Sequence, residues 1–429
     1  VKGGAQTQSY EIRADSYDEN RHFFLSHFFR DQYNTALAGL PFVNSQVNIT
    51  RIEVWVTNTN TATNDIRSIV AFAELGEDIS HIPVDQQTFI TDLSSTTLPF
   101  NGQNNLDTLL KSNSGVRSIS TTISSINSLS GNAMNQQTNY EQIASARKLS
   151  PSEFTLNPLL GYISLRQKLT PAQAMSVAFQ YTYNGQVFQV GEFSDGGISA
   201  PDALYTKMLK STATNTNHPM WDLMMKNIYS MGAYQVSPDD FRMDVFYTNK
   251  ATGTDINYLP VTSCHTDVHE KPLIQVLNVD RLNQQNDNKP DGLFDFIDGV
   301  TILSKNGLII FPVVEPFGNH LSSKFTTTCS STDAAEYAFP QLYDSTKVIA
   351  QQFFPQLNRF VIKGTYQSSS SSEISLGSPN VAQGSVIVTA GGITLTENVD
   401  YTVDYTLGRV KIINEGILNS GTPLKVKSG

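Results

Sequence analysis

Apolar and polar residues alternate with the period of a β-strand most regularly over residues 175–193, MSVAFQYTYNGQVFQVGEF. Two alternating runs flank Asn184 and Gly185. A type I′ turn requires positive φ at both of its central positions, and Asn followed by Gly is the pair that adopts it most readily. The pattern therefore predicts a β-hairpin whose arms meet at Asn184-Gly185.

Helical periodicity begins near the N-terminus, where aromatic and aliphatic residues recur at spacings of three to five over 17–37. Asp18 is placed to cap the start of such a helix, and Gly39 follows its end. The remaining predicted helices cover 104–111, 139–148, 201–211, 219–230 and 334–352.

Strands are expected where β-branched and aromatic residues alternate or form short apolar runs. The predicted strands are 48–58, 68–75, 242–248, 271–280 and 358–367. A second turn is expected at Asn306-Gly307, between two apolar runs.

These elements together predict an α+β fold of mixed helices and antiparallel sheets or hairpins, with a C-terminal all-β unit. Ser, Thr and Asn dominate 91–139, which we expect to be a loop or weakly structured apart from its short helix. The predicted division is an N-terminal helix-plus-strands unit at 1–90, a Ser/Thr/Asn-rich excursion with a helix at 91–155, a central α+β region at 156–365 containing the 175–193 hairpin, and a C-terminal β-unit at 366–429.

Composition narrows the functional classes. The chain has 429 residues, 39% hydrophobic and 16% charged, with a formal net charge of -10. That charge argues against a nucleic-acid surface, because phosphate binding relies on Lys and Arg. No run reaches the roughly 18 apolar residues that a membrane helix requires.

The start of the chain, VKGGAQTQSY, has neither Met nor a signal sequence and is typical of a segment of a longer precursor. Common nucleophile, zinc-protease and nucleotide-binding motifs are missing, so we expect no enzymatic activity and no cofactor.

Acidic residues crowd one stretch, NQQNDNKPDGLFDFIDG at 283–299. The oxygen-bearing side chains of Asn286, Asn288, Asp291 and Asp295 give one candidate calcium loop, with Gly292 allowing a tight turn. The spacing is not that of an EF-hand, and its closing Glu is missing. The alternative is a polar turn in which Asp and Asn accept hydrogen bonds from nearby backbone amides.

The two cysteines, Cys264 and Cys329, leave three interpretations. Cys264, His265 and His269 invite a zinc site, but a fourth ligand would have to come from elsewhere in the chain. A Cys264–Cys329 disulfide is favoured over zinc and requires an oxidising compartment. Two unconnected buried thiols are the default expectation.

Several blocks of sequence carry a family resemblance. They are YDENRHFFL, RIEVWVTN, LGYISLRQKL, YNGQVFQVGEFS, DGLFDFIDGVTI, GLIIFPVVEPFG, QLYDSTK and NRFVIKG, together with the closing VTAGGITLTENVDYTVDYTLGRVKIIN. In this order they resemble the SprA/Sov family, the outer-membrane translocon protein of the type IX secretion system, which is also tied to gliding motility. The serine-rich region at 100–135 and the tract at 368–372 match no block of that family.

The resemblance implies a role in protein export across the outer membrane and in gliding motility. Its implied partners are the rest of the parent translocon barrel, PorV, a periplasmic plug protein and secreted cargo with a C-terminal secretion domain. Helices and long polar loops cannot face lipid. We therefore expect a soluble segment of the parent, on the extracellular side as a cap or pore frame, with the periplasmic side as the alternative. A calcium-dependent cell-surface adhesin or glycan-binding module is the alternative function.

Overall fold

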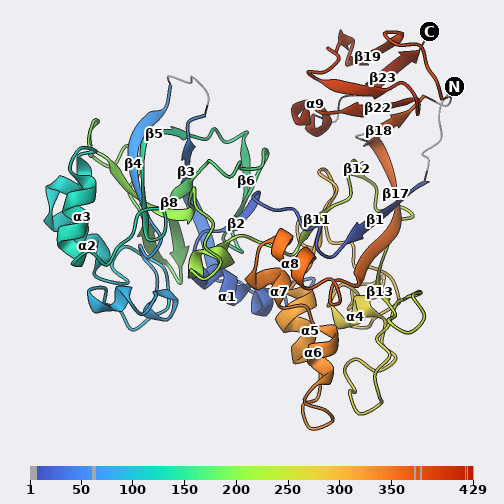
Figure 1. Ribbon diagram of the computed structural model, residues 1–429, viewed down its shortest axis with the longest axis horizontal. Coiled ribbons are helices and arrows are strands. Elements are labelled where there is room, and N and C mark those ends of the chain that lie inside the picture. The colour runs from blue at the N-terminus through green and yellow to red at the C-terminus, as the bar shows by residue number, and fades with distance from the viewer. Residues whose placement is uncertain are drawn as a thin grey trace. The chain divides into compact units, whose positions relative to one another are not determined.

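The computed structural model describes residues 7–59, 64–371, 373–376, 379–420, 422 and 424–428 (Figure 1). The chain forms two compact units. Asp18–Lys226 and Tyr343–Thr346 form the first, called the 18–226 unit; Val1–Tyr17, Asn227–Leu342 and Lys347–Gly429 form the second, called the 227–429 unit. Both mix helices with mainly antiparallel sheets, so the predicted α+β class is confirmed. Within the described ranges, no helix is long and apolar enough to cross a membrane.

A small barrel is the core of the 18–226 unit. Its sheet has the order β10-β4-β5-β3-β8-β9, and β10 also pairs with β8. Because β10 pairs with β4 on one side and β8 on the other, five of the strands close on themselves and leave β9 outside. The strands are β3 (Val47–Thr57), β4 (Ile66–Phe72), β5 (Tyr140–Lys148), β8 (Met175–Tyr183), β9 (Gln186–Val190) and β10 (Leu204–Lys210).

The hairpin predicted from alternation is confirmed. Strands β8 and β9 pair antiparallel, with Tyr183 opposite Gln186. Asn184 and Gly185 between them have φ of 48° and 77°, as a type I′ turn requires. Strands β3 and β4 also lie where the sequence predicts them.

Three predicted helices that lie in this unit or end just beyond it are wrong. The 139–148 segment is strand β5, and 201–211 contains strand β10. The 219–230 segment holds only the 3₁₀ turn η4 (Pro219–Leu223), followed by β11 (Ile228–Ser230). β5 has good helix formers, but it lies between β3 and β4 and bonds to both. Pairing on two sides outweighs helix propensities of a few tenths of a kcal/mol per residue.

The N-terminal helix is shorter than predicted. Strand β2 (His22–Phe24) occupies its expected first turns, and α1 (His27–Ala36) follows. Asp18 does not cap the helix, since its carboxylate contacts the His22 imidazole. β2 forms a second sheet with β6 (Phe154–Asn157) and β7 (Tyr162–Leu165) in the order β2-β7-β6.

The Ser/Thr/Asn-rich segment is ordered, so the expected weak structure is wrong. The predicted helix at 104–111 is confirmed as α2 (Leu106–Ser112). The turn η3 (Ser114–Arg117) and helix α3 (Thr122–Ser130) follow, and α2 and α3 pack together (Figure 1). Val116 and Ile126 are fully buried, so a few apolar residues anchor an otherwise polar segment. Two shorter 3₁₀ turns precede it, η1 (Ile79–His81) and η2 (Gln86–Thr88).

The 227–429 unit is built around the predicted 358–367 strand, which is confirmed as β17 (Phe360–Ser371). It pairs antiparallel with β1, β12 and β13, and β14 continues the sheet beyond β13. A separate three-stranded sheet has the order β11-β16-β15. The strands are β1 (Thr7–Arg13), β12 (Ala233–Val236), β13 (Arg242–Thr248), β14 (Asp255–Ile256), β15 (Ile302–Leu303) and β16 (Leu308–Ile310).

The Asn306-Gly307 turn joins β15 and β16 as predicted. Gly307 has φ of +63°, and a Cβ there would lie 1.9 Å from the Ala233 carbonyl oxygen. Glycine is therefore required for both its backbone conformation and its close approach to β12.

Two other predictions for this unit need correction. The expected strand at 271–280 is instead a short helix, α4 (Leu273–Val276), preceded by Pro272. The expected helix at 334–352 is broken on either side of Pro340, which cannot continue a helix from the preceding residue. Its place is taken by α6 (Asp333–Tyr337), α7 (Gln341–Asp344) and α8 (Lys347–Phe353). Two further helical turns precede them, η5 (Pro316–His320) and α5 (Leu321–Ser323).

The C-terminal part has its own apolar core, including Val388, Tyr401 and Val410. Two three-stranded sheets, β18-β22-β21 and β20-β19-β23, supply it. The predicted β-rich tail is thus confirmed, with one short helix added. Its elements are β18 (Glu373–Ser375), β19 (Val386–Ala390), β20 (Ile393–Thr394), β21 (Tyr401–Asp404), β22 (Arg409–Ile412), α9 (Glu415–Asn419) and β23 (Leu424–Ser428).

Candidate functional site

The crowded acidic loop is held by backbone amides. Asp295 is 7% exposed, and its carboxylate accepts hydrogen bonds from the N–H groups of Arg281 (2.6 Å) and Leu282 (3.2 Å). Asp280 likewise accepts from the N–H groups of Asp291 (3.1 Å) and Gly292 (2.9 Å). Burial raises the pKa of Asp295 to about 6, and the nearby Asp280 and Asp291 charges add to the rise. The hydrogen bonds from the Arg281 and Leu282 amides act in the opposite direction and lower this pKa. Backbone amides therefore serve as hydrogen-bond partners of the Asp280 and Asp295 carboxylates.

The four candidate calcium ligands have different surroundings. Asn286 and Asn288 are exposed, and Asn286 sits in a turn with φ of 64°. Asp291 uses Oδ1 to accept from the Leu293 N–H at 3.0 Å, while Asp295 is buried. Among the residues that the structure describes, no group of three or more His, Cys, Asp or Glu could hold a metal ion. These hydrogen bonds are those of the polar-turn alternative, and a melting experiment decides between that turn and the candidate calcium loop.

We expect calcium to leave the melting temperature of the chain unchanged, because the Asp280, Asp291 and Asp295 carboxylates already accept backbone hydrogen bonds. The measurement compares thermal unfolding in millimolar calcium and in chelator, for wild type and for Asp291→Ala plus Asp295→Ala. A calcium site filled to about 100 times its Kd would stabilise the fold by ~2.7 kcal/mol. A calcium-dependent rise in melting temperature that the double variant loses would restore the calcium loop.

The two cysteines are joined. Cys264 and Cys329 form a disulfide with Cα atoms 5.9 Å apart, so the default expectation of two unconnected thiols is wrong. The zinc interpretation is also contradicted, because neither sulfur is free to bind a metal. Both ring nitrogens of the adjacent His265 are used: Nε2 contacts the Asp333 carboxylate at 2.8 Å, and Nδ1 accepts from the Thr326 N–H at 3.0 Å. The disulfide and His265 thus tie the 264–269 turn to the segment that leads into α6.

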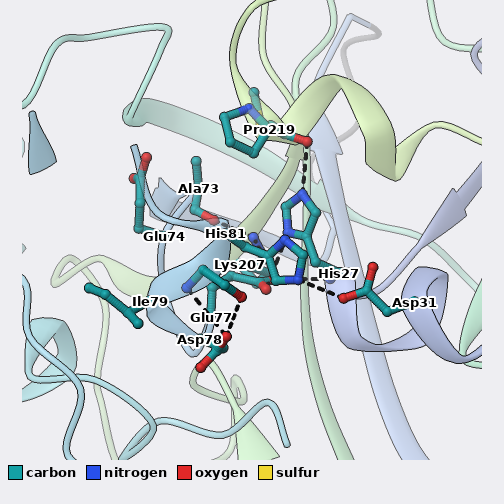
Figure 2. A network of polar contacts seen from close by, with 12 residues as sticks. His27, Asp31, Ala73, Glu74, Glu77, Asp78, Ile79, His81, Lys207 and Pro219 are labelled. Atoms are coloured by element: carbon teal, nitrogen blue, oxygen red, sulfur yellow. Dashed lines mark hydrogen bonds and ion pairs between the residues drawn. The ribbon is translucent and has the colours of Figure 1, made fainter. Parts of the chain in front are cut away.

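Sequence reasoning missed a buried polar network in the 18–226 unit (Figure 2). Glu77 is 2% exposed, and its carboxylate lies 3.3 Å from Lys207 Nζ on β10 and 3.2 Å from His27 Nδ1 on α1. Lys207 is fully buried and also donates to the Ala73 carbonyl. Burial opposes ionisation of Glu77, but Lys207 and His27 outweigh it and lower the pKa of Glu77 to about 2. An ionised Glu77 carboxylate therefore lies inside this unit, beside Lys207.

Histidines extend this network. The His27 and His81 rings stack with centroids 4.6 Å apart, and His27 Nε2 donates to the Pro219 carbonyl at 2.8 Å (Figure 2). His81 contacts Asp31 of α1 at 2.6 Å. Although burial lowers the pKa of His81, the Asp31 hydrogen bond outweighs it, and the net pKa is raised. Nearby, His218 contacts Glu74 at 2.8 Å. These contacts join α1, the 73–81 segment, β10 and η4 at one point.

A second buried group joins β2 to β7. The His22 ring contacts Ser164 Oγ at 2.7 Å through Nδ1 and Asp18 Oδ2 at 2.8 Å through Nε2. These are the residue types of a hydrolase triad, but His22 is fully buried and Ser164 is 8% exposed. We therefore assign the group a structural role. The i, i+4 spacing of Asp18 and His22 is the one sequence signal for this group, and it also fits the helix that the sequence predicts over 17–37.

The comparisons with known proteins agree with the resemblance that the sequence carries. Residues 1–189 match the SprA_N family model, described as a motility related/secretion protein. No curated protein matches the chain. The matched range contains the barrel strands β3, β4, β5 and β8, the Asp18–His22–Ser164 group, and Glu77 with the His27 and His81 side chains. Residues 1–189 are thus similar to the SprA/Sov family, whose N-terminal model is described as motility- and secretion-related.

Proposed function

We propose that the chain is a segment of the outer-membrane translocon of the type IX secretion system, taking part in protein export and in gliding motility. The observation that carries this proposal is the match of residues 1–189 to a motility and secretion family. We assign it no catalytic reaction and no cofactor. Its contribution is to cap or frame the export pore.

The disulfide supports a position outside the cytoplasm. Disulfides persist in the periplasm and at the cell surface, whereas cytosolic thiols are kept reduced. The Cys264–Cys329 bond links residues 65 positions apart, so it constrains a large segment of the 227–429 unit. Export machinery of the outer membrane works in such oxidising surroundings.

Buried polar networks support a framing role. Glu77, Lys207 and the paired histidines fix α1 against the barrel, and a small closed barrel leaves few strand edges exposed. A rigid segment of this kind suits a fixed surface for other proteins. The proposed partners are the remainder of the parent barrel, PorV, a periplasmic plug protein and cargo with a C-terminal secretion domain.

We propose the extracellular side, with the periplasmic side as the alternative, and cysteine labelling in intact cells separates them. The described residues contain no free cysteine, so an introduced thiol is read without interference from Cys264 or Cys329. Ser128→Cys on α3 and Thr252→Cys in the 249–254 turn are exposed positions. Ser176→Cys is the matched control, because Ser176 is fully buried.

A membrane-impermeant maleimide should label the parent protein with Ser128→Cys and Thr252→Cys in intact cells, but not with Ser176→Cys. Labelling only after the outer membrane is permeabilised would place the segment in the periplasm. Labelling of neither exposed position in either condition, with the parent present at normal level, would contradict a position at either face of the outer membrane.

A further inference from the structure

One cavity in the 18–226 unit has no role in the export proposal. It has a volume of about 210 Å³ and lies between α1, the 44–47 segment, the 159–160 segment and the end of β8. Its walls are fixed: the Ser45 hydroxyl donates to the Leu159 carbonyl at 2.6 Å, and the Asn44 N–H donates to the Ala36 carbonyl at 2.8 Å. The cavity is therefore a formed feature of the fold.

Aromatic rings supply its apolar surface. Phe29 and Tyr33 are buried beneath it, and Phe28 and Tyr183 are partly exposed. Gly161, with φ of +67°, lets the 159–160 segment approach, since a Cβ there would lie 2.3 Å from the Phe29 ring. The face of a ring-shaped ligand can pack on these aromatic side chains.

Its polar surface consists of uncharged groups. Gln32, Asn44 and Gln46 contribute exposed carboxamides, and no residue that lines the cavity carries a formal charge. Within the described part of the chain, these three side chains make no hydrogen bond to protein. Each carboxamide offers donors and an acceptor to a ligand.

We propose that this cavity binds a neutral sugar ring. A sugar hydroxyl donates and accepts, as a carboxamide does, and the C–H face of a pyranose packs on aromatic rings. The missing charge disfavours an anionic or cationic ligand. An extended peptide adding to a sheet needs an exposed strand edge, but β3 and β8, which contribute Val47 and Tyr183 to the cavity, are inner strands.

The test is saturation-transfer NMR on the whole chain with glucose, galactose, mannose and N-acetylglucosamine as separate millimolar probes. Glucuronate and an uncharged tripeptide are the comparison probes. At least one neutral sugar should show saturation transfer in wild type. Gln32→Ala and Asn44→Ala should each weaken its binding about fivefold, the loss of about one hydrogen bond.

Two variants make the result specific. Thr35→Trp places a large side chain at an exposed lining position and should abolish the transfer. Gln352→Ala, an exposed helical glutamine of α8 outside the cavity, is the matched control and should bind as wild type does. Unchanged melting temperatures show that the variants fold. Saturation transfer to none of the four sugars, equal transfer in Thr35→Trp, or transfer only to glucuronate or the peptide overturns the proposal.

Discussion

Replacing Lys207 by Met should destabilise the 18–226 unit by about 3–5 kcal/mol. Lys207 is fully buried and lies 3.3 Å from Glu77, which is 2% exposed. Its removal leaves the buried Glu77 carboxylate without its lysine partner, and that poorly compensated charge is the main cost. Equilibrium unfolding in urea measures the change.

A matched control separates this effect from the general loss of a lysine. Lys111 pairs with Asp107 at 2.8 Å on α2, with 45% of its side chain exposed. Lys111→Met should change stability by less than about 0.5 kcal/mol, as exposed helical pairs do. If the two variants lose the same stability, the buried network has no special role in holding the unit together.

The stability lost in Lys207→Met should also depend on pH. The native pKa of Glu77 is lowered to about 2 from its usual 4.5, so its ionised form contributes stability above pH 4.5 that is lost as pH falls toward 2. Without Lys207, the Glu77 carboxyl should take up a proton more readily. The difference in free energy of unfolding between wild type and Lys207→Met should therefore shrink as the pH falls. The double variant Lys207→Met plus Glu77→Gln should also lose less stability than Lys207→Met alone.

Reducing the Cys264–Cys329 disulfide should destabilise the 227–429 unit by roughly 4 kcal/mol, the chain-entropy value for a loop closed over 65 residues. The double variant Cys264→Ser plus Cys329→Ser should lose the same stability in oxidising buffer. Thermal unfolding of wild type and variant, each with and without reductant, measures both losses.

Only wild type should respond to the reductant, because the variant has no disulfide to lose. Both cysteines lie in the 227–429 unit. An unchanged melting temperature of reduced wild type would show that the bond contributes nothing to the fold.

Local signals in the sequence predicted the elements that local chemistry determines. The hairpin was predictable because Asn184-Gly185 specifies one turn type, and β3, β13 and β17 because their β-branched and aromatic residues favour strands. The strands β5 and β10 were mistaken for helices because partners distant in sequence determine their conformation: β5 pairs with β3 and β4, and β10 with β4 and β8. Composition alone does not contain that pairing.

Polar groups, too, were predictable where their residues are neighbours in sequence and were missed where the residues are distant. The acidic loop was visible because its residues are neighbours in sequence, whereas Lys207 and Glu77 are 130 positions apart in sequence and meet only in the closed barrel. His81 and Asp31 are 50 positions apart and gave no motif. The disulfide lay between these cases, since two cysteines allow only one pairing but do not reveal whether it forms.

The most direct test of the central claim is a secretion assay on cells whose parent translocon protein lacks residues 10–425 of this chain. Export of cargo with a C-terminal secretion domain and leakage of large solutes across the outer membrane are measured together, with the level of the shortened parent followed by immunoblot. We predict that secretion is lost, or that the outer membrane becomes leaky to large solutes, while the shortened parent is still present. Normal secretion with an intact permeability barrier, at a normal level of the shortened parent, would contradict the proposed function.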